Sequence, residues 1–149
     1  MGVVRESELV VLPPDRARSL WTDLGRWATF VEGFARVLEA DPEWPAEGSK
    51  LVWESIPEGR GRVTERVVES SGDAIATEVF EDALSGRQTV TFEADDGETL
   101  VEVELDYKLT QGGPLRAITD VIFIRRALSA ALARTLRRFA AEAAEEASL

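Results

Sequence analysis

The hydrophobic pattern divides the chain into one strand, two short helices, a run of strands and a long helix. Residues 3–12 alternate and are rich in β-branched side chains, which predicts a strand. Two prolines and Asp15 stop this strand, and proline is tolerated in the first turn of a helix. Apolar residues then recur at helical spacing over 17–24 and over 27–34, with Gly25 between the two stretches. We therefore expect two short helices, each with an aromatic face.

Six further strands are predicted between residues 36 and 110. Turn-forming sequences such as Asp95–Gly97 separate them, and short strands joined by tight turns favour an antiparallel sheet. In the last strand Val101 and Val103 alternate with Glu102, so one face is buried and the other is solvated. The expected strands are Arg36–Ala40, Lys50–Ile56, Gly61–Ser70, Ala74–Asp82, Arg87–Ala94 and Thr99–Thr110.

A segment without Gly or Pro, from Leu115 to about Ala147, predicts a long C-terminal helix. Its arginines are expected to face solvent or to pair with acidic residues of the sheet. An alternative directs Arg125 to an anionic group of a ligand. The apolar start, residues 117–128, is also compatible with a homodimer, in which it packs against a second copy of the chain. The expected apolar face includes Leu115, Ile118, Ile122, Leu132, Leu136 and Phe139.

Composition narrows the chemistry that is available to the chain. Its 149 residues, 44% of them hydrophobic, fit a single domain over residues 1–149. There is no Cys and no His, which excludes a thiol nucleophile, a histidine base and Cys/His metal sites. Acid–base chemistry must use Asp, Glu, Tyr, Lys or water, and we expect no metal and no cofactor.

Charge and hydropathy also limit the kinds of partner that the protein can have. The net charge of −11 argues against nucleic-acid binding, which needs a positive surface. No segment has the length and hydropathy of a membrane span, and the N-terminus lacks the pattern of a signal peptide. We therefore expect a cytoplasmic protein without membrane insertion.

Several local motifs, in order, resemble those of the START/Bet v 1-like superfamily, in particular its bacterial polyketide cyclase/dehydrase and lipid-transport (SRPBCC) group. The resemblance covers nearly the whole chain. It implies an α+β helix-grip fold, in which a curved antiparallel sheet of about seven strands and a long C-terminal helix enclose a cavity. The motifs are Leu12–Asp15 with Leu20-Trp21, Asp23–Trp27, Gly48–Trp53, Gly61–Glu65, Gly97–Val101 and Gly112–Pro114.

The resemblance implies three functions. Many relatives hold an apolar ligand, so the first is binding of a small hydrophobic molecule, either a lipid or a polyketide-like compound. The second is a polyketide cyclase or dehydratase in which Tyr107 and Glu65 act as the acid–base groups. The third is an interaction domain without a ligand, whose core is filled by its own 4 Trp and 6 Phe.

Most candidate ligand-binding residues have a structural alternative. Aromatic residues of the two short helices either contact the ligand at the mouth of the cavity or anchor these helices to the sheet. Trp53 either fills the cavity or supports a ligand. Gln88 shares a strand face with Val90 and Phe92, and its amide either orients a ligand or bonds to nearby backbone. The candidates are Trp27, Phe30, Phe34, Trp53, Gln88, Phe92, Tyr107, Ile118, Ile122 and Arg125.

Glu65 and Tyr107 are the polar groups expected to face the cavity. Alternation places Glu65 with Val63 and Val67, where a buried carboxyl group has a raised pKa and can transfer protons. Alternatively, twist or a bulge turns Glu65 outward to an arginine. Tyr107 lies on the buried face of its strand, where its hydroxyl needs a partner. Related cyclases hold an arginine in the pocket, but alternation places Arg66 on the opposite face.

Overall fold

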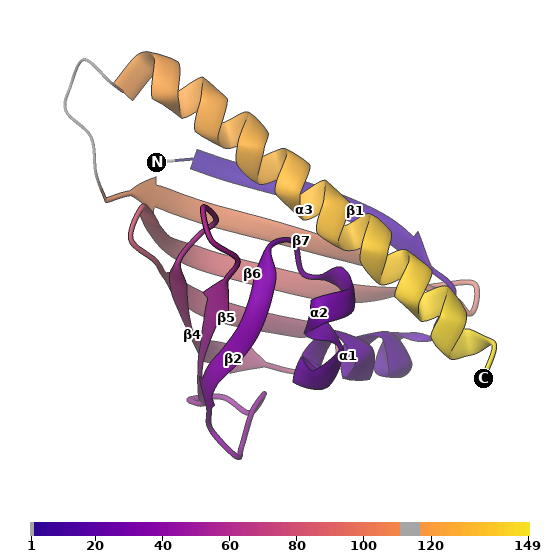
Figure 1. The fold of residues 1–149 in the computed structure, drawn as a ribbon. Helices are drawn as coiled ribbons and strands as arrows, with labels where there is room; N and C mark the ends of the chain where they lie inside the picture. The colour runs from indigo at the N-terminus through magenta and orange to yellow at the C-terminus, as the bar shows by residue number, and fades with distance from the viewer. Residues whose placement is uncertain (1, 111–116) are drawn as a thin grey trace.

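The structure is a computed structural model that describes residues 2–110 and 117–149, with the side chains of 117–121 left out. Every expected helix and strand is present, with ends shifted by a few residues, and the α+β helix-grip fold is confirmed (Figure 1). The elements are β1 (Gly2–Val10), α1 (Pro14–Thr22), the 3-10 turn η1 (Leu24–Arg26), α2 (Trp27–Phe30), β2 (Phe34–Ala40), β3 (Lys50–Ser55), β4 (Arg62–Ser70), β5 (Ala74–Phe80), β6 (Leu84–Asp95), β7 (Glu98–Leu109) and α3 (Ala117–Ala147).

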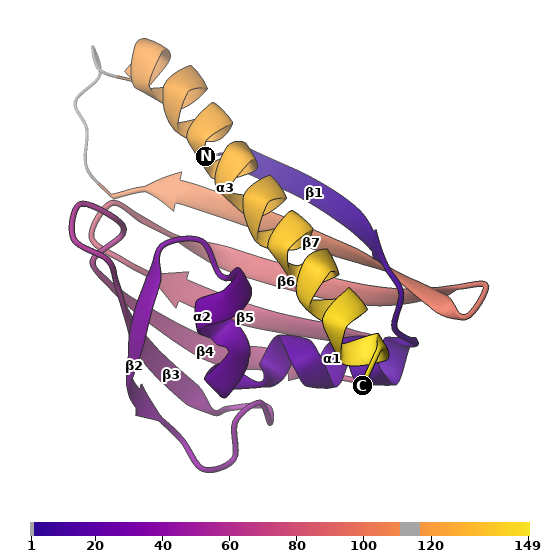
Figure 2. The same cartoon turned by 45° about the vertical axis from the view of Figure 1, so that its right-hand side comes forward.

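The seven strands form one antiparallel sheet in the order β1-β7-β6-β5-β4-β3-β2. From β2 to β7 the chain is a meander, because each strand pairs with the next. The helices α1 and α2 carry the chain from β1 to the opposite edge, where β2 begins, and α3 crosses the same side of the sheet (Figures 1 and 2). Register shifts in the β2–β3 and β4–β5 pairs mark bulges, which increase the twist of a sheet.

The core lies between the sheet and the helices. Aromatic rings join α1, α2 and α3: Phe139 contacts Trp21 at 5.1 Å and Phe30 at 5.0 Å between ring centroids. Edge-to-face pairs at such distances add stability beyond the area they bury. This cluster holds the last turns of α3 against the two short helices.

The first half of α3 corrects one prediction. Ile122 was expected on the apolar face, but it is 54% exposed, and its neighbour Phe123 is 73% exposed. Ile124 and Leu128 pack inward instead, against a small cluster beside β1. Residues four apart share a helix face, whereas residues two apart lie on nearly opposite sides. The inward stripe through 124, 128 and 132 therefore leaves Ile122 in solvent. Ile118 lies in the stretch whose side chains are outside the described residues.

No helix within residues 2–110 and 117–149 combines the length and hydropathy that a membrane crossing requires.

Candidate functional site

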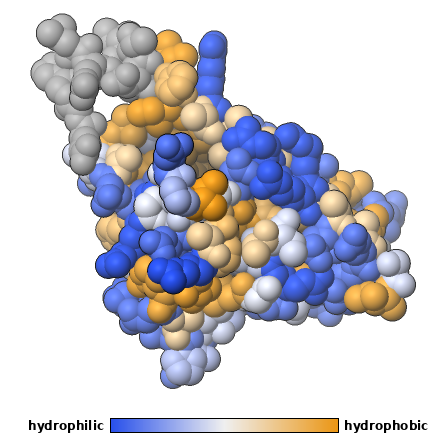
Figure 3. All heavy atoms as spheres, viewed as in Figure 1, coloured by the Kyte–Doolittle hydropathy of each residue, from blue (hydrophilic) through white to orange (hydrophobic). Residues whose placement is uncertain are grey.

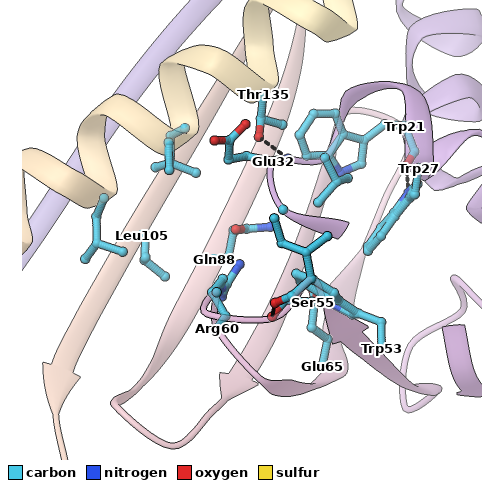
Figure 4. Close-up of a pocket in the computed structure, with 17 residues that line it drawn as sticks. Trp21, Trp27, Glu32, Trp53, Ser55, Arg60, Glu65, Gln88, Leu105 and Thr135 are labelled. Atoms are coloured by element: carbon cyan, nitrogen blue, oxygen red, sulfur yellow. Dashed lines mark hydrogen bonds between the residues drawn. The ribbon is translucent and has the colours of Figure 1, made fainter. Parts of the chain in front are cut away.

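A cavity of about 240 Å³ lies between the sheet and the middle of α3. Figure 4 shows its lining side chains, and Figure 3 shows hydrophobic atoms around a hollow beside α3, with hydrophilic side chains around it. The α2–β2 corner and the β3–β4 loop both contribute to the lining. Apolar lining residues are Trp21, Trp27, Val31, Trp53, Ile56, Leu105, Leu128, Ala131 and Leu132, and polar ones are Glu32, Ser55, Arg60, Glu65, Gln88 and Thr135.

Three tryptophans form a rigid aromatic wall of this cavity. Trp27 Nε1 donates a hydrogen bond to the backbone oxygen of Trp21 at 2.7 Å. The rings of Trp27 and Trp53 meet edge to face at 6.2 Å. Because both indoles are buried and held by these contacts, they offer apolar surface to a ligand without a large loss of side-chain entropy.

Glu65 is the buried carboxyl group of the cavity. It is 5% exposed and lies on β4 between the buried residues Val63 and Val67, so the inward orientation is observed and the outward alternative is not. Its Oε2 accepts a hydrogen bond from Trp53 Nε1 at 2.7 Å, and its Oε1 accepts one from Thr77 Oγ1 at 3.1 Å. Burial raises the pKa of Glu65, while these hydrogen bonds and the charge of Arg60 oppose the shift. A carboxyl group with a raised pKa keeps its proton to a higher pH than an exposed one, which makes Glu65 a candidate for proton transfer.

Arg60 supplies the cation that the sequence analysis did not find. It lies in the β3–β4 loop between Gly59 and Gly61, where Gly61 has a φ of +80° that glycine adopts without strain. Its guanidinium lies 5.2 Å from the centre of the Trp53 ring. Arg60 Nε donates to Glu81 Oε2 at 2.6 Å, and the Glu81 side chain is only 5% exposed. This ion pair fixes the guanidinium at the edge of the cavity.

Gln88 reaches the cavity from β6, on the strand face that it shares with the buried residues Val90 and Phe92. Its amide has no hydrogen-bond partner among the residues that the structure describes. Figure 4 shows Gln88 and Arg60 among the side chains that line the cavity. The sheet and the β3–β4 loop therefore each contribute a hydrogen-bond donor to the lining.

The α2–β2 corner, residues 31–33, is held by hydrogen bonds to two other parts of the structure. The backbone N–H of Glu32 donates to Thr135 Oγ1 at 2.9 Å, and the Glu32 carboxylate accepts bonds from Arg134 and Arg138 at 3.0 and 2.6 Å. Ile56 N–H donates to the oxygen of Gly33 at 2.8 Å. These contacts connect the corner to α3 and to the β3–β4 loop. Two of the α3 arginines thus pair with an acid of the corner rather than of the sheet.

Three aromatic residues that were predicted to bind a ligand pack beside the cavity without lining it. Phe30 is enclosed by Trp21 and Phe139, and Phe34 contacts the rings of Trp27 and Trp53. Phe92 is buried in the same core. The positions of Phe30 and Phe34 correspond to the anchoring alternative of the sequence analysis, whereas Phe92 is a core residue of β6.

Tyr107 and Arg125 also lie away from the cavity. Tyr107 is buried as expected, but it packs with Val4 and Leu84 in a separate small cluster and does not line the cavity. Leu105, two residues earlier on the same face of β7, is the β7 residue that does. Arg125 Nη2 donates to the backbone oxygen of Val3 at 3.0 Å and therefore faces β1.

Sequence reasoning missed Arg60, Ser55, Glu32 and Thr135. The first two lie at or after the end of a strand, and Glu32 lies in a corner, where no periodicity indicates a direction. The sequence Gly59-Arg60-Gly61, a charged residue within a glycine turn between two apolar strands, is the one signal that singles out Arg60.

Comparisons with known proteins agree with this fold. The family model described as polyketide cyclase/dehydrase and lipid transport matches residues 1–144. No curated protein has a matching sequence. The structure of protein TTHA0849 from Thermus thermophilus is 16% identical, with a TM-score of 0.77 over 97% of this chain and 99% of that one. Zhui aromatase/cyclase from a Streptomyces species is 16% identical, with a TM-score of 0.71 over 98% and 95%. The di-domain ARO/CYC StfQ of the steffimycin pathway is 18% identical, with a TM-score of 0.75 over 99% of this chain and 52% of its own.

Proposed function

Because the chain belongs to the polyketide cyclase/dehydrase and lipid transport family, we propose that it binds a small hydrophobic molecule in the cavity beside α3. The observation that carries this proposal is the aromatic hollow itself. Its volume of about 240 Å³ is left between tryptophans and leucines in an otherwise packed core. An apolar cavity with a few converging polar groups is the usual form of a ligand site.

The dimensions of the cavity support a compact ligand. Ligand pockets typically start at roughly 300 Å³, so this cavity favours a ligand of one or two rings over a long acyl chain. Affinity would come mainly from burial of apolar surface, at about 25 cal/mol per Å² before the costs of association. Polar groups of the lining, among them Glu65, Gln88 and Arg60, would set the orientation. These features favour a polyketide-like compound over a lipid.

A second candidate function is an enzyme of the cyclase or dehydratase type. Two structural neighbours, Zhui and StfQ, are aromatase/cyclases, which supports this candidate, as does the position of Glu65 in the wall of the cavity. Glu65 would take the acid–base role alone, because Tyr107 lies in the separate cluster beside β1. The cavity argues against the third function, an interaction domain with a filled core.

A pair of substitutions on α3 tests the proposed binding. Ala131 lines the cavity, whereas its neighbour Ala130 is exposed. Ala131→Phe should fill part of the cavity and weaken binding of the neutral probe 2-methoxynaphthalene at least tenfold. Binding is measured by the quenching of tryptophan fluorescence. Ala130→Phe, the matched control, should bind as the wild type does. Equal binding by both variants would show that the probe occupies another place, and absence of binding by the wild type would refute the proposal. Native mass spectrometry of the purified protein would then identify a natural ligand.

A further inference from the structure

The first turns of α3 present an exposed aromatic side chain. Apart from the C-terminal Leu149, Phe123 has the largest exposed fraction, 73%, among the large hydrophobic residues that the structure describes. Ala127 and Ala130, four and seven residues later, share its helix face and are also exposed. In Figures 1 and 2 no other helix or strand lies on the outer side of these turns. This surface, the Phe123 face, is thus an apolar patch without a cover, which is typical of a contact with a partner.

Residues of opposite charge flank the Phe123 face. Asp120 precedes Phe123 by three residues and Arg126 follows it by three, so the two positions lie about 60° to either side of Phe123 around the helix. Arg126 is exposed and has no ion-pair partner within the described part of the chain. A partner of one charge sign, such as a nucleic acid or an anionic membrane, would be attracted on one side and repelled on the other. The charges instead complement a second copy of the same surface in reverse order.

We propose that two copies of the chain form a homodimer through the Phe123 face, with their α3 helices packed antiparallel about a two-fold axis at Phe123. The proposal concerns a surface outside the cavity and does not depend on the proposed function. A two-fold axis makes a surface patch meet its own copy, so the patch must be self-complementary. The residues around Phe123 meet this requirement, because reversal of the helix direction exchanges the acid and the base.

The antiparallel arrangement defines the contacts. The two Phe123 rings meet at the axis and become buried together. Position 120 of one copy lies opposite position 126 of the other, so Asp120 and Arg126 form two symmetric ion pairs. Ala127 and Ala130 carry no bulky side chain, which lets the two helices approach closely. A parallel arrangement would instead bring the two Arg126 side chains together, where they repel each other.

The size of the interface sets the expected affinity. Stable interfaces bury about 1,200–2,000 Å² in total, whereas contact along the exposed start of one helix lies at or below the lower end of this range. The dimer should therefore be reversible, with a dissociation constant of about 10–100 µM.

Sedimentation velocity of the full chain, from about 1 µM to about 1 mM, measures this equilibrium. The wild type should pass from monomer to dimer over this range, and Phe123→Ser should weaken the dimer at least about tenfold because it removes the buried rings. Ile122→Ser is the matched control, since Ile122 is also more than half exposed but lies about 100° away around the helix, and it should keep the wild-type affinity. A wild type that stays monomeric throughout overturns the proposal, and so does a dimer that Phe123→Ser leaves intact.

An exchange of charges tests the orientation of the helices. Asp120→Arg and Arg126→Asp each place like charges opposite one another, so each should weaken the dimer at least about threefold at low salt. The double variant Asp120→Arg/Arg126→Asp restores opposite charges and should recover the wild-type affinity. A double variant that is no tighter than the single variants overturns the antiparallel assignment. Circular dichroism establishes that each variant is folded; if Asp120→Arg is unfolded, Arg126→Asp alone decides, through a weakening that high salt should remove.

Discussion

Glu65→Gln is the substitution whose effect the structure defines most closely. A glutamine side chain has nearly the same shape and keeps both contacts. Its carboxamide oxygen accepts from Trp53 Nε1, and its NH₂ group donates to Thr77 Oγ1. The substitution therefore removes the ionisable proton and little else. The energetic difference between wild type and variant reports the cost of ionising Glu65 within the protein.

The sign of the pH dependence follows from the direction of the pKa shift. Burial raises the pKa of Glu65 in the folded protein above the ordinary value of 4.5 that it has in the unfolded chain. The stabilisation by Glu65 is thus fully present below pH 4.5 and is lost as the pH rises through the folded-state pKa. Between the two pKa values the variant gains on the wild type by about 1.4 kcal/mol per pH unit, the slope for one proton.

Urea denaturation of both proteins from about pH 4 to pH 8 measures this difference in the free energy of unfolding. Near pH 4 both side chains are uncharged, and we expect the two stabilities to agree within about 1.5 kcal/mol, the net value of one hydrogen bond. At higher pH the variant should become the more stable of the two relative to that baseline. Glu78→Gln, on the exposed face of β5, is the matched control and should show no such trend. A difference that stays constant with pH, or one that moves in favour of the wild type, would refute the reasoning.

Three further substitutions test separate parts of the structure by denaturation. Thr77→Val removes a bond that lowers the pKa of Glu65, so it should cost about 1 kcal/mol at low pH and more at high pH; a constant cost would contradict this. Gly86→Ala should cost about 1–3 kcal/mol because its Cβ would lie 2.2 Å from the backbone oxygen of Asp106. Gly72→Ala, the control, has open space around the added Cβ and should be nearly neutral. Equal costs for the two variants would refute the close approach at Gly86. Glu32→Gln should cost at most about 1 kcal/mol and less in high salt, since its arginine partners are partly exposed, and a large salt-independent cost would show another role.

Alternation along the strands is the reason that much of the architecture is readable in the sequence. A strand has a period of two, so in the absence of a bulge Val63, Glu65 and Val67 share a face, and a face with two valines is expected to be buried. The same reasoning places Gln88 with Val90 and Phe92, and both polar side chains do line the cavity. A prediction of this kind needs no knowledge of the neighbouring strands, because it depends only on local geometry.

Alternation does not indicate where along a strand the cavity ends. Tyr107 and Leu105 share the inner face of β7, yet only Leu105 reaches the cavity, because β1 and α3 cover the end of β7. The helical pattern fails for a related reason at Ile122. A sequence with apolar residues on two faces does not state which face meets the sheet, and contact with β1 selects the stripe through Ile124 and Leu128.

The sequence alone therefore determined the elements and their order, since each depends on spacing within one segment. It left two directions open for Glu65, and the folded sheet selects the inward one. Tertiary structure alone decided the position of Arg60 at the cavity, its ion pair with Glu81 and the ion pairs that join Glu32 of the α2–β2 corner to α3. These residues lie in loops and corners, where side-chain direction has no period. Their partners are 21 and 102 residues away along the chain, so only the folded sheet and helix bring them together.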